Sequence, residues 1–244
     1  MAGTFPNLSS GTVAKYPVVR SLIFPVKRVR FLDDTEQSWR TAPAINRWTL
    51  AYTKLSYADV TTLKTFFATQ KGSFDSTWSF SIDGATWTSM KFEDDRFSSQ
   101  ETGPNRHSVN LNISQTMKSG SYASGSISVF PTINGGVQVQ YPFTTNDDFL
   151  TTKVTMDTGL QFAWYNRTAT LNSWPLRFPV VTNSEAVALF DFYAKALGPQ
   201  TYFSFTDPNT AVTHTRVRFG LQPIQRTYTG PTTSEVTLLL EETA

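Results

Sequence analysis

The 244-residue chain contains no cysteine, so disulfide bonds, thiolate metal sites and cysteine nucleophiles are excluded. Long hydrophobic runs are also missing, and the chain opens with neither a basic nor an apolar segment, so we expect no secretory signal and no membrane span. An excess of one charge is lacking too: 21 basic residues face 19 acidic ones, which gives no electrostatic footprint for nucleic acid. These features predict a soluble protein made in a reducing cytosol.

Aromatic residues are abundant instead. They make up 14% of the chain, against only 16% for charged residues, which is enough hydrophobic material for a core in each of two domains. A chain of this length forms either one large β domain or two domains of ordinary size. The choice depends on whether the sequence repeats.

The sequence does repeat, and the clearest copies are Ser56–Gly72 and Thr182–Gly198. In the first copy, Ser56 and Asp59 have the spacing of a helix capping box. An apolar stripe at three- and four-residue spacing follows, and a glycine stands just past the last apolar residue, where a left-handed helix stop needs no Cβ. The second copy repeats every feature: Thr182 and Glu185 form the box, Leu189, Phe192 and Tyr193 the stripe, and Gly198 the stop.

Other landmarks recur at nearly the same offset. Tyr141-Pro142 follows Tyr16-Pro17 by 125 residues, and Trp174 follows Trp48 by 126. We interpret the pattern as a tandem duplication in which each unit is a run of strands, one helix and more strands. The predicted fold class is α+β and mostly β, with two tandem β-sandwich or small-barrel domains, each flanked by one α-helix.

The domain boundaries follow from composition. We expect a first domain over residues 1–116, in which residues 1–11 form a polar arm ordered only by a partner. Residues 117–136 are rich in Ser and Gly and are typical of a linker. The second domain is expected over residues 137–244. A third polar segment, Asp94–Arg106, is predicted to be a loop.

Two hairpins are also predicted. Val26–Phe31 alternates apolar and basic residues, which indicates a half-buried strand with its cations in solvent, and a turn at Asp33-Asp34 leads to a partner strand at Gln37–Arg40. Asp83-Gly84 predicts the second hairpin.

Candidate catalytic residues are few. The two histidines, His107 and His214, lie at non-equivalent positions of the repeat, and neither is near a nucleophile motif. Asp94 and Asp95, with Glu93 and Glu101 nearby, suggest a carboxylate pair for glycoside hydrolysis or a calcium site, but a solvated loop is the favoured interpretation. Asp147-Asp148 is interpreted as a turn. We therefore predict no catalytic, cofactor-binding or metal-binding residues and no enzyme activity.

The tryptophans and one basic strand allow binding functions as alternatives. The six tryptophans, Trp39, Trp48, Trp78, Trp87, Trp164 and Trp174, are either a sugar-binding face or, as favoured by their strand and repeat positions, core. Lys27, Arg28 and Arg30 are either a stripe for polynucleotide or, as favoured, a wet strand face or partners in intersubunit ion pairs.

The arrangement resembles a known family. The strand Val26–Asp33, the strand through Trp48 and the capped helix ending at Gly72 look like the minor tail proteins of long-tailed bacteriophages, with lambda-type minor tail protein M the nearest type. The helix Thr182–Gly198, followed by Tyr202–Pro208 and His214–Phe219, similarly resembles phage distal tail and minor tail domains. The resemblance covers residues 16–115 and 141–242.

This resemblance implies the tail-tube fold, a β-sandwich flanked by one helix that closes into rings around a lumen, with no catalytic residues. It implies a virion protein at the distal end of the tail, assembled in the host cytoplasm, with the tail tube, tape-measure and tip or hub proteins as partners and DNA passing through without sequence-specific contacts.

Two units per chain predict a trimer with pseudo-sixfold symmetry, with a hexamer as the alternative. Residues 1–11, 94–106 and 117–136 are expected to reach neighbouring molecules. A carbohydrate-binding module of a tail tip and a hydrolase using the acidic loop are the competing functions.

Overall fold

The computed structural model describes residues 3–9, 14, 16–30, 36–70, 72, 77–82, 84–116, 127–133, 136, 139–148, 151–157, 159–165 and 171–243. Within these residues the fold is α+β and mostly β, as predicted. The first half contains β1 (Gly3–Thr4), β2 (Val18–Ile23), β3 (Val26–Arg30), β4 (Glu36–Arg40), β5 (Ile45–Leu55), α1 (Tyr57–Thr69), β6 (Trp78–Ile82), β7 (Ala85–Phe92), β8 (Ser99–Gly103) and β9 (Arg106–Thr116). The second contains β10 (Asn146–Asp148), β11 (Thr151–Thr155), β12 (Gln161–Tyr165), β13 (Leu171–Thr182), α2 (Asn183–Lys195), β14 (Phe203–Thr206), β15 (Thr213–Phe219), β16 (Ile224–Tyr228) and β17 (Thr233–Glu242).

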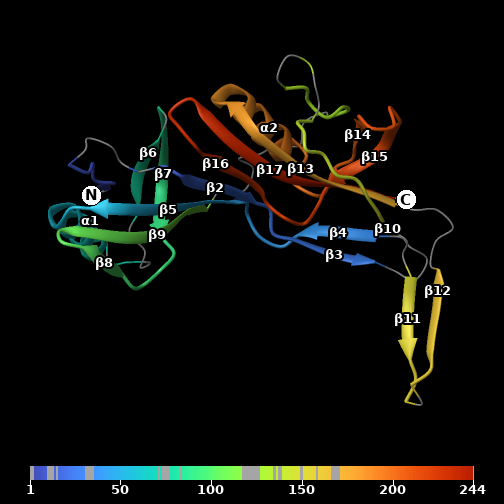
Figure 1. Ribbon diagram of the computed structural model, residues 1–244, viewed down its shortest axis with the longest axis horizontal. Coiled ribbons are helices and arrows are strands. Elements are labelled where there is room, and N and C mark those ends of the chain that lie inside the picture. The colour runs from blue at the N-terminus through green and yellow to red at the C-terminus, as the bar shows by residue number, and fades with distance from the viewer. Residues whose placement is uncertain are drawn as a thin grey trace.

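One hydrogen-bonded sheet runs through both halves of the described chain (Figure 1). Its main path is β1-β6-β7-β9-β5-β2-β16-β17-β13-β10, and β3–β4 and β11–β12 form separate two-stranded hairpins. The sheet branches at β9, because β5 occupies one edge of this strand while β7 and β8 share the other. It branches in the same way at β17, which pairs with β13 on one edge and with β15 and β16 on the other.

Both helices form where the capping pattern predicts them. The hydroxyl of Ser56 accepts from the N–H of Asp59 at the start of α1, and that of Thr182 accepts from the N–H of Glu185 at the start of α2. The predicted stops also occur: Gly72 and Gly198 have φ angles of +60° and +64°, a region that favours glycine.

Each half has its own hydrophobic cluster. The buried stripes of α1 and α2 cover them, with Leu63 and Phe67 in the first and Leu189 and Tyr193 in the second. Each cluster also includes residues from the other half of the chain: Leu22 and Phe24 belong to the second cluster, and Tyr228 belongs to the first. The two cores are therefore interlocked where the halves meet.

The expectation of a free arm at residues 1–11 is wrong for the part that the structure describes. Thr4 pairs with Ser79 in a parallel strand pair, and Phe5 and Leu8 are buried in the first cluster. The ring of Phe5 lies 5.5 Å from that of Phe66 and 5.3 Å from that of Trp78. A two-residue strand leaves no periodicity in the sequence, which is why composition alone indicated an arm.

The linker expectation is corrected in the same way. Residues 117–126 lie outside the described part, but Phe130 and Ile133 are buried in the second cluster, and Val129 forms a parallel bridge with Ser204. This bridge repeats the pairing of Thr4 with Ser79, one repeat unit further along the chain. The described part of the predicted linker therefore packs into the second half through an isolated bridge and two buried side chains.

The Asp94–Arg106 segment is not only a loop, since β8 lies inside it and pairs with β9. Asp147 and Asp148, expected in a turn, lie in strand β10. The hairpin β3–β4 is confirmed, and the expected turn at Asp33-Asp34 lies outside the described residues. The second hairpin, β6–β7, is confirmed as well.

The strand registers of the two halves correspond. Trp48 faces Ile113 and Trp174 faces Leu240, and Ser21 faces Arg47 as Asn146 faces Ser173. Likewise Ser99 faces Val109 as Arg226 faces Val236. Each of these equivalences has nearly the same offset as the sequence repeat. Strand β10 is thus the counterpart of β2, and β8 is the counterpart of β16.

Candidate functional site

The most elaborate polar arrangement of the described chain lies where the two halves meet. There β2 pairs antiparallel with β16, from Val18 opposite Tyr228 to Leu22 opposite Ile224. Strand β2 thereby connects the first-half strand β5 to the second half, and the main path of the sheet continues across the junction.

Arg20 lies at the centre of this junction and is buried. Its guanidinium group lies between two rings, with its carbon 4.3 Å from the ring centre of Trp87 in the first half and 4.6 Å from that of Phe190 on α2. It donates to the side-chain oxygen of Asn46 at 2.9 Å. One side chain therefore connects the two halves through cation–π contacts and a hydrogen bond away from bulk water.

Arg226 lies opposite Arg20 and is also buried. It donates to the hydroxyl of Ser234 at 2.9 Å and to the side-chain oxygen of Asn183, the first residue of α2. Its guanidinium carbon lies 4.0 Å from the ring centre of Tyr228. These partners hold the second cation within its own half.

The hairpin β3–β4 reaches across the junction to the second half. Arg28 forms an ion pair with Glu241 of β17 at 2.8 Å, and Glu36 forms one with Arg218 of β15. These side chains are mostly shielded from solvent. Arg28 thus corrects the expectation that the cations of this strand face water, whereas Lys27 is exposed; the side chain of Arg30 is outside the described residues.

The counterparts of these two junction strands each have one edge with no strand partner among the described residues. Strand β8 branches off the main path and pairs there only with β9, and β10 ends the path and pairs there only with β13. The hairpin β11–β12, the counterpart of β3–β4, extends away from the body of the molecule in Figure 1. It exposes four large apolar side chains, Val154, Met156, Leu160 and Phe162. Exposed apolar side chains of this size on a projecting hairpin are typical of a contact surface.

His214 lies beside β10, in the second-half counterpart of the Arg20 site. Its Nδ1 atom lies 2.7 Å from a carboxylate oxygen of Glu242, and its ring packs edge-on against Trp174. The other Glu242 oxygen accepts from the backbone and side chain of Asn172. The carboxylate of Glu242 is thus held between the imidazole of His214 and Asn172.

A hollow of about 400 Å³ adjoins His214 and is lined in part by Thr145, Asp147 and Asp207. Asp207 is buried and accepts from the indole N–H of Trp174 at 3.3 Å. In the first half, the repeat aligns Arg20 with Thr145 and Trp87 with His214, and the Arg20 guanidinium carbon lies 4.3 Å from the ring centre of Trp87. The hollow beside Thr145 and His214 thus corresponds in the repeat to the site of Arg20 and Trp87 at the internal junction.

The other candidate residues do not converge. His107 lies on β9, packs against Tyr57 and faces the exposed Glu101 across the strand pair. Glu93 forms an ion pair with Arg47 at 2.8 Å, and Asp94 accepts from Asn112. Within the described ranges, no group of three or more His, Asp or Glu side chains is placed to hold a metal ion.

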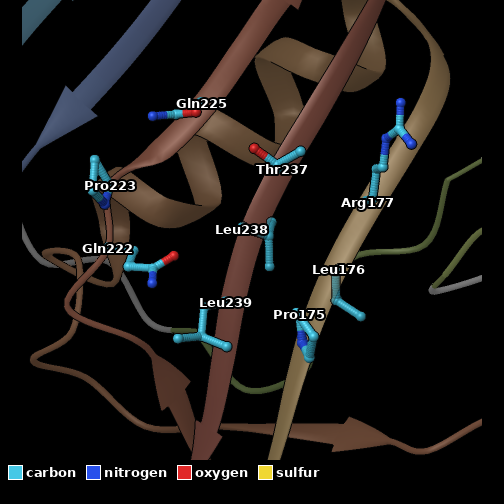
Figure 2. A pocket seen from close by; sticks show the side chains of 9 residues that line it. All are labelled: Pro175, Leu176, Arg177, Gln222, Pro223, Gln225, Thr237, Leu238 and Leu239. Carbon is cyan, nitrogen blue, oxygen red and sulfur yellow. The ribbon is translucent and has the colours of Figure 1, made fainter. Parts of the chain in front are cut away.

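A second hollow, of about 360 Å³, lies over β13, β17 and the turn before β16 (Figure 2). Proline and leucine side chains, including Pro175, Pro223 and Leu239, line much of it. Among its lining residues Arg177 alone is ionisable, and it donates to both carboxylate oxygens of Glu235, at 2.8 and 3.0 Å.

The tryptophans are mainly core, as favoured from the sequence. Trp48, Trp78 and Trp174 are fully buried, and Trp87 is half-buried beside Arg20. Trp39, at 40% exposure, is the one exposed tryptophan among the five whose side chains the structure describes. Among these five, the tryptophans therefore form no exposed patch.

The sequence pattern missed the junction residues. Arg20 has a sequence signature, a cation inside the apolar strand Val18–Ile23, but its partners Asn46, Trp87 and Phe190 are distant in the chain. Among the described residues, no helix is both long and apolar enough to cross a bilayer. Comparison with protein-family models and with curated protein sequences gives no match.

Proposed function

We propose that this chain is a structural component of a long-tailed bacteriophage tail, forming a closed ring at the distal end that connects the tail tube to the tip. The junction between its halves is the observation that carries the proposal. Strands β2 and β16 from different halves pair there, whereas each of their counterparts, β10 and β8, has one edge without a strand partner among the described residues. Such a molecule can associate head to tail, which yields a ring when the rotation closes.

The proposal includes a tandem duplication of one sheet-and-helix unit with the tail-tube fold. Matching helix caps at Ser56 and Thr182, matching glycine stops and matching strand registers support it. Trp48 and Trp174 occupy equivalent positions and are both fully buried. Trp48 packs against Trp87, and Trp174 packs against His214, which is the residue equivalent to Trp87.

With two units per chain, three chains provide six equivalent wedges. We therefore propose a trimer with pseudo-sixfold symmetry, and six chains per ring is the alternative. Covalent linkage of the two units replaces half of the association steps with intramolecular ones. The tail tube, tape-measure and tip proteins are the proposed neighbours along the tail axis, and the proposed location is the virion after assembly in the host cytoplasm.

The sheet face turned away from the buried clusters is the proposed channel lining. It carries neutral polar side chains such as Thr49, Asn112 and Thr227. Charged residues on this face form ion pairs, Arg47 with Glu93 and Arg177 with Glu235. Because such a surface has little net charge, it binds the phosphate backbone weakly and lets DNA slide through.

Electron cryomicroscopy of the purified chain, reconstructed without imposed symmetry, tests this function. The proposal expects a closed ring with an open centre and six similar wedges. A solitary molecule with no central opening contradicts it. Genes for a tail tube, a tape measure and a tip protein beside the coding region form an independent expectation.

A further inference from the structure

We propose that neighbouring chains join through a second copy of the internal junction, in which residues 97–101 of one chain, at the start of β8, pair antiparallel with residues 143–147 of the next, which run into β10. This inference rests on the proposed ring and specifies its contact. The partner is a second copy of this chain, because the surface that β10 requires is already present at the opposite end of the same molecule.

The register of the proposed contact follows from the internal one. Gln225 faces Ser21 across β16 and β2, and Thr227 faces Val19. The alignment of the two halves superimposes Arg226 of β16 on Ser99 of β8, and Ser21 of β2 on Asn146 of β10.

Applied to the internal pairs, this alignment places Ser98 opposite Asn146 and Gln100 opposite Thr144. All four side chains are exposed in the single chain. They are therefore accessible to a neighbouring molecule.

Open strand edges also make this contact favourable. An unpaired edge presents a row of backbone donors and acceptors that pairs readily with another strand. Pairing β8 with β10 continues the described sheet from chain to chain in the same manner as β2 and β16 continue it within one chain. Because the contact joins two different edges, an open assembly of several copies always has one free β8 at one end and one free β10 at the other. Further copies can therefore add until the ring closes.

Charge complementarity favours the same arrangement. At the internal junction, Phe190 of α2 reaches over β2 to Arg20. The residue equivalent to Phe190 on α1 is Lys64, which is exposed. The proposed contact brings this lysine of one chain over the hollow of the next chain, which Asp147 and Asp207 line. In the proposed contact, Lys64 thus takes the place of Phe190, and the acidic hollow takes the place of Arg20.

The projecting hairpin completes the contact. Within one chain, β3–β4 lies against β15 and β17 through the ion pairs of Arg28 and Glu36. The equivalent receiving strands in the first half are β7 and β9, where Lys91 faces Ser114 as Arg218 faces Glu241. The β11–β12 hairpin of one chain is therefore directed to this site on its neighbour, where Val154 and Phe162 lose their exposure.

Cysteine crosslinking tests the register directly, because the natural chain has no cysteine. The full chain carrying Ser98→Cys and Asn146→Cys is treated with a short bis-maleimide. We expect covalent oligomers on a denaturing gel, up to the full ring size. The internal pair Val19→Cys and Thr227→Cys, which lie opposite each other with partly exposed side chains, is the matched control, and it is expected to give an intramolecular crosslink without oligomers.

The outcomes separate the contact from the ring. Rings that form without crosslinks at Ser98 and Asn146, while the internal pair reacts, overturn the proposed contact and leave the ring intact. A chain that stays monomeric overturns both. Covalent dimers from Ser98→Cys alone indicate a two-fold contact and also overturn it. The pair Gln100→Cys and Thr144→Cys repeats the test in case one variant folds poorly.

Charge reversal gives a second readout. Lys64→Glu is expected to weaken ring assembly at least tenfold, and adding Asp147→Lys in the same chain is expected to restore it. Full assembly of Lys64→Glu contradicts the contact.

Discussion

Arg20 and Arg226 lie directly opposite each other across the β2–β16 strand pair, and both are buried. Two like charges at this spacing repel, so each needs its own partners. Arg20 binds Asn46 and two aromatic rings, whereas Arg226 binds Ser234 and Asn183. The junction of the halves is thus a specific polar contact inside an otherwise apolar interior.

The first prediction concerns Arg20. Arg20→Ala is expected to lower the free energy of unfolding by about 2–3 kcal/mol, because it removes the cation packed on Trp87 and Phe190 and the hydrogen bonds that Arg20 donates to Asn46. Urea denaturation followed by tryptophan fluorescence measures the loss. We also expect the two halves of the variant to unfold in separate transitions.

Two controls accompany Arg20→Ala. Arg20→Met fills most of the same space and is expected to lose less stability. Lys27→Ala removes an exposed cation and is expected to change stability by at most about 0.5 kcal/mol. Equal losses for all three variants contradict a structural role for Arg20.

The second prediction concerns the segment that composition alone assigned to a free arm. Phe5→Ala is expected to destabilise the isolated chain by about 3–5 kcal/mol, because the ring is buried against Phe66, Trp78 and Phe80. Phe130→Ala, the equivalent change in the second half, is expected to cost a similar amount. Thermal unfolding measures both, and an unchanged melting temperature for either shows that its segment behaves as an arm.

The third prediction concerns pH. Burial raises the pKa of Asp59, but hydrogen bonds from Ser9 and Ser56 outweigh it and hold the pKa below the ordinary value. Since the folded-state pKa is lowered, this carboxylate stabilises the fold above the unfolded-state pKa, and the contribution is lost as pH falls through the folded-state value. Asp59→Asn is therefore expected to be less stable than the natural chain at about pH 6 and to approach it at about pH 3.

Denaturant titrations at several pH values measure this difference. Glu101→Gln, an exposed carboxylate on β8, is the control that is expected to show no such convergence. A stability difference between Asp59→Asn and the natural chain that does not change with pH rules out the stated role of the carboxylate.

The fourth prediction concerns a helix stop. A Cβ at Gly198 would lie 2.9 Å from the Cβ of Phe24, and the φ angle of +64° already disfavours other residues. Gly198→Ala is expected to cost more than Gly84→Ala, by at least about 1 kcal/mol. Gly84 has a φ angle of +77° but no atom within 4 Å of the added Cβ, so it isolates the backbone strain. Equal losses contradict a tight contact between Phe24 and the end of α2.

Local features were predictable from the sequence because their causes are local. The caps at Ser56 and Thr182, the glycine stops and the β6–β7 hairpin depend on residues a few positions apart. The joined sheet was not predictable, since β2 lies near the start of the chain and β16 near its end, and neither strand's sequence shows which edge it uses.

The site residues follow the same rule. The pairing of His214 with Glu242 and the burial of Asp207 arise from strands that only the fold brings together. The burial of Phe5 and Phe130 was not predicted, because each is a single apolar residue in a segment of polar composition. The repeat nevertheless relates Phe130 to Phe5 by the same offset as the two Tyr-Pro pairs, so a closer comparison of the copies contains that information.

The mass of the assembled chain in solution tests the central claim most directly. Mass photometry over a range of concentrations is expected to give one closed species of three times the 27.3 kDa chain mass, with no larger ladder. Six chains per ring contradict the trimer, and a species that remains at the mass of one chain at every concentration contradicts the ring.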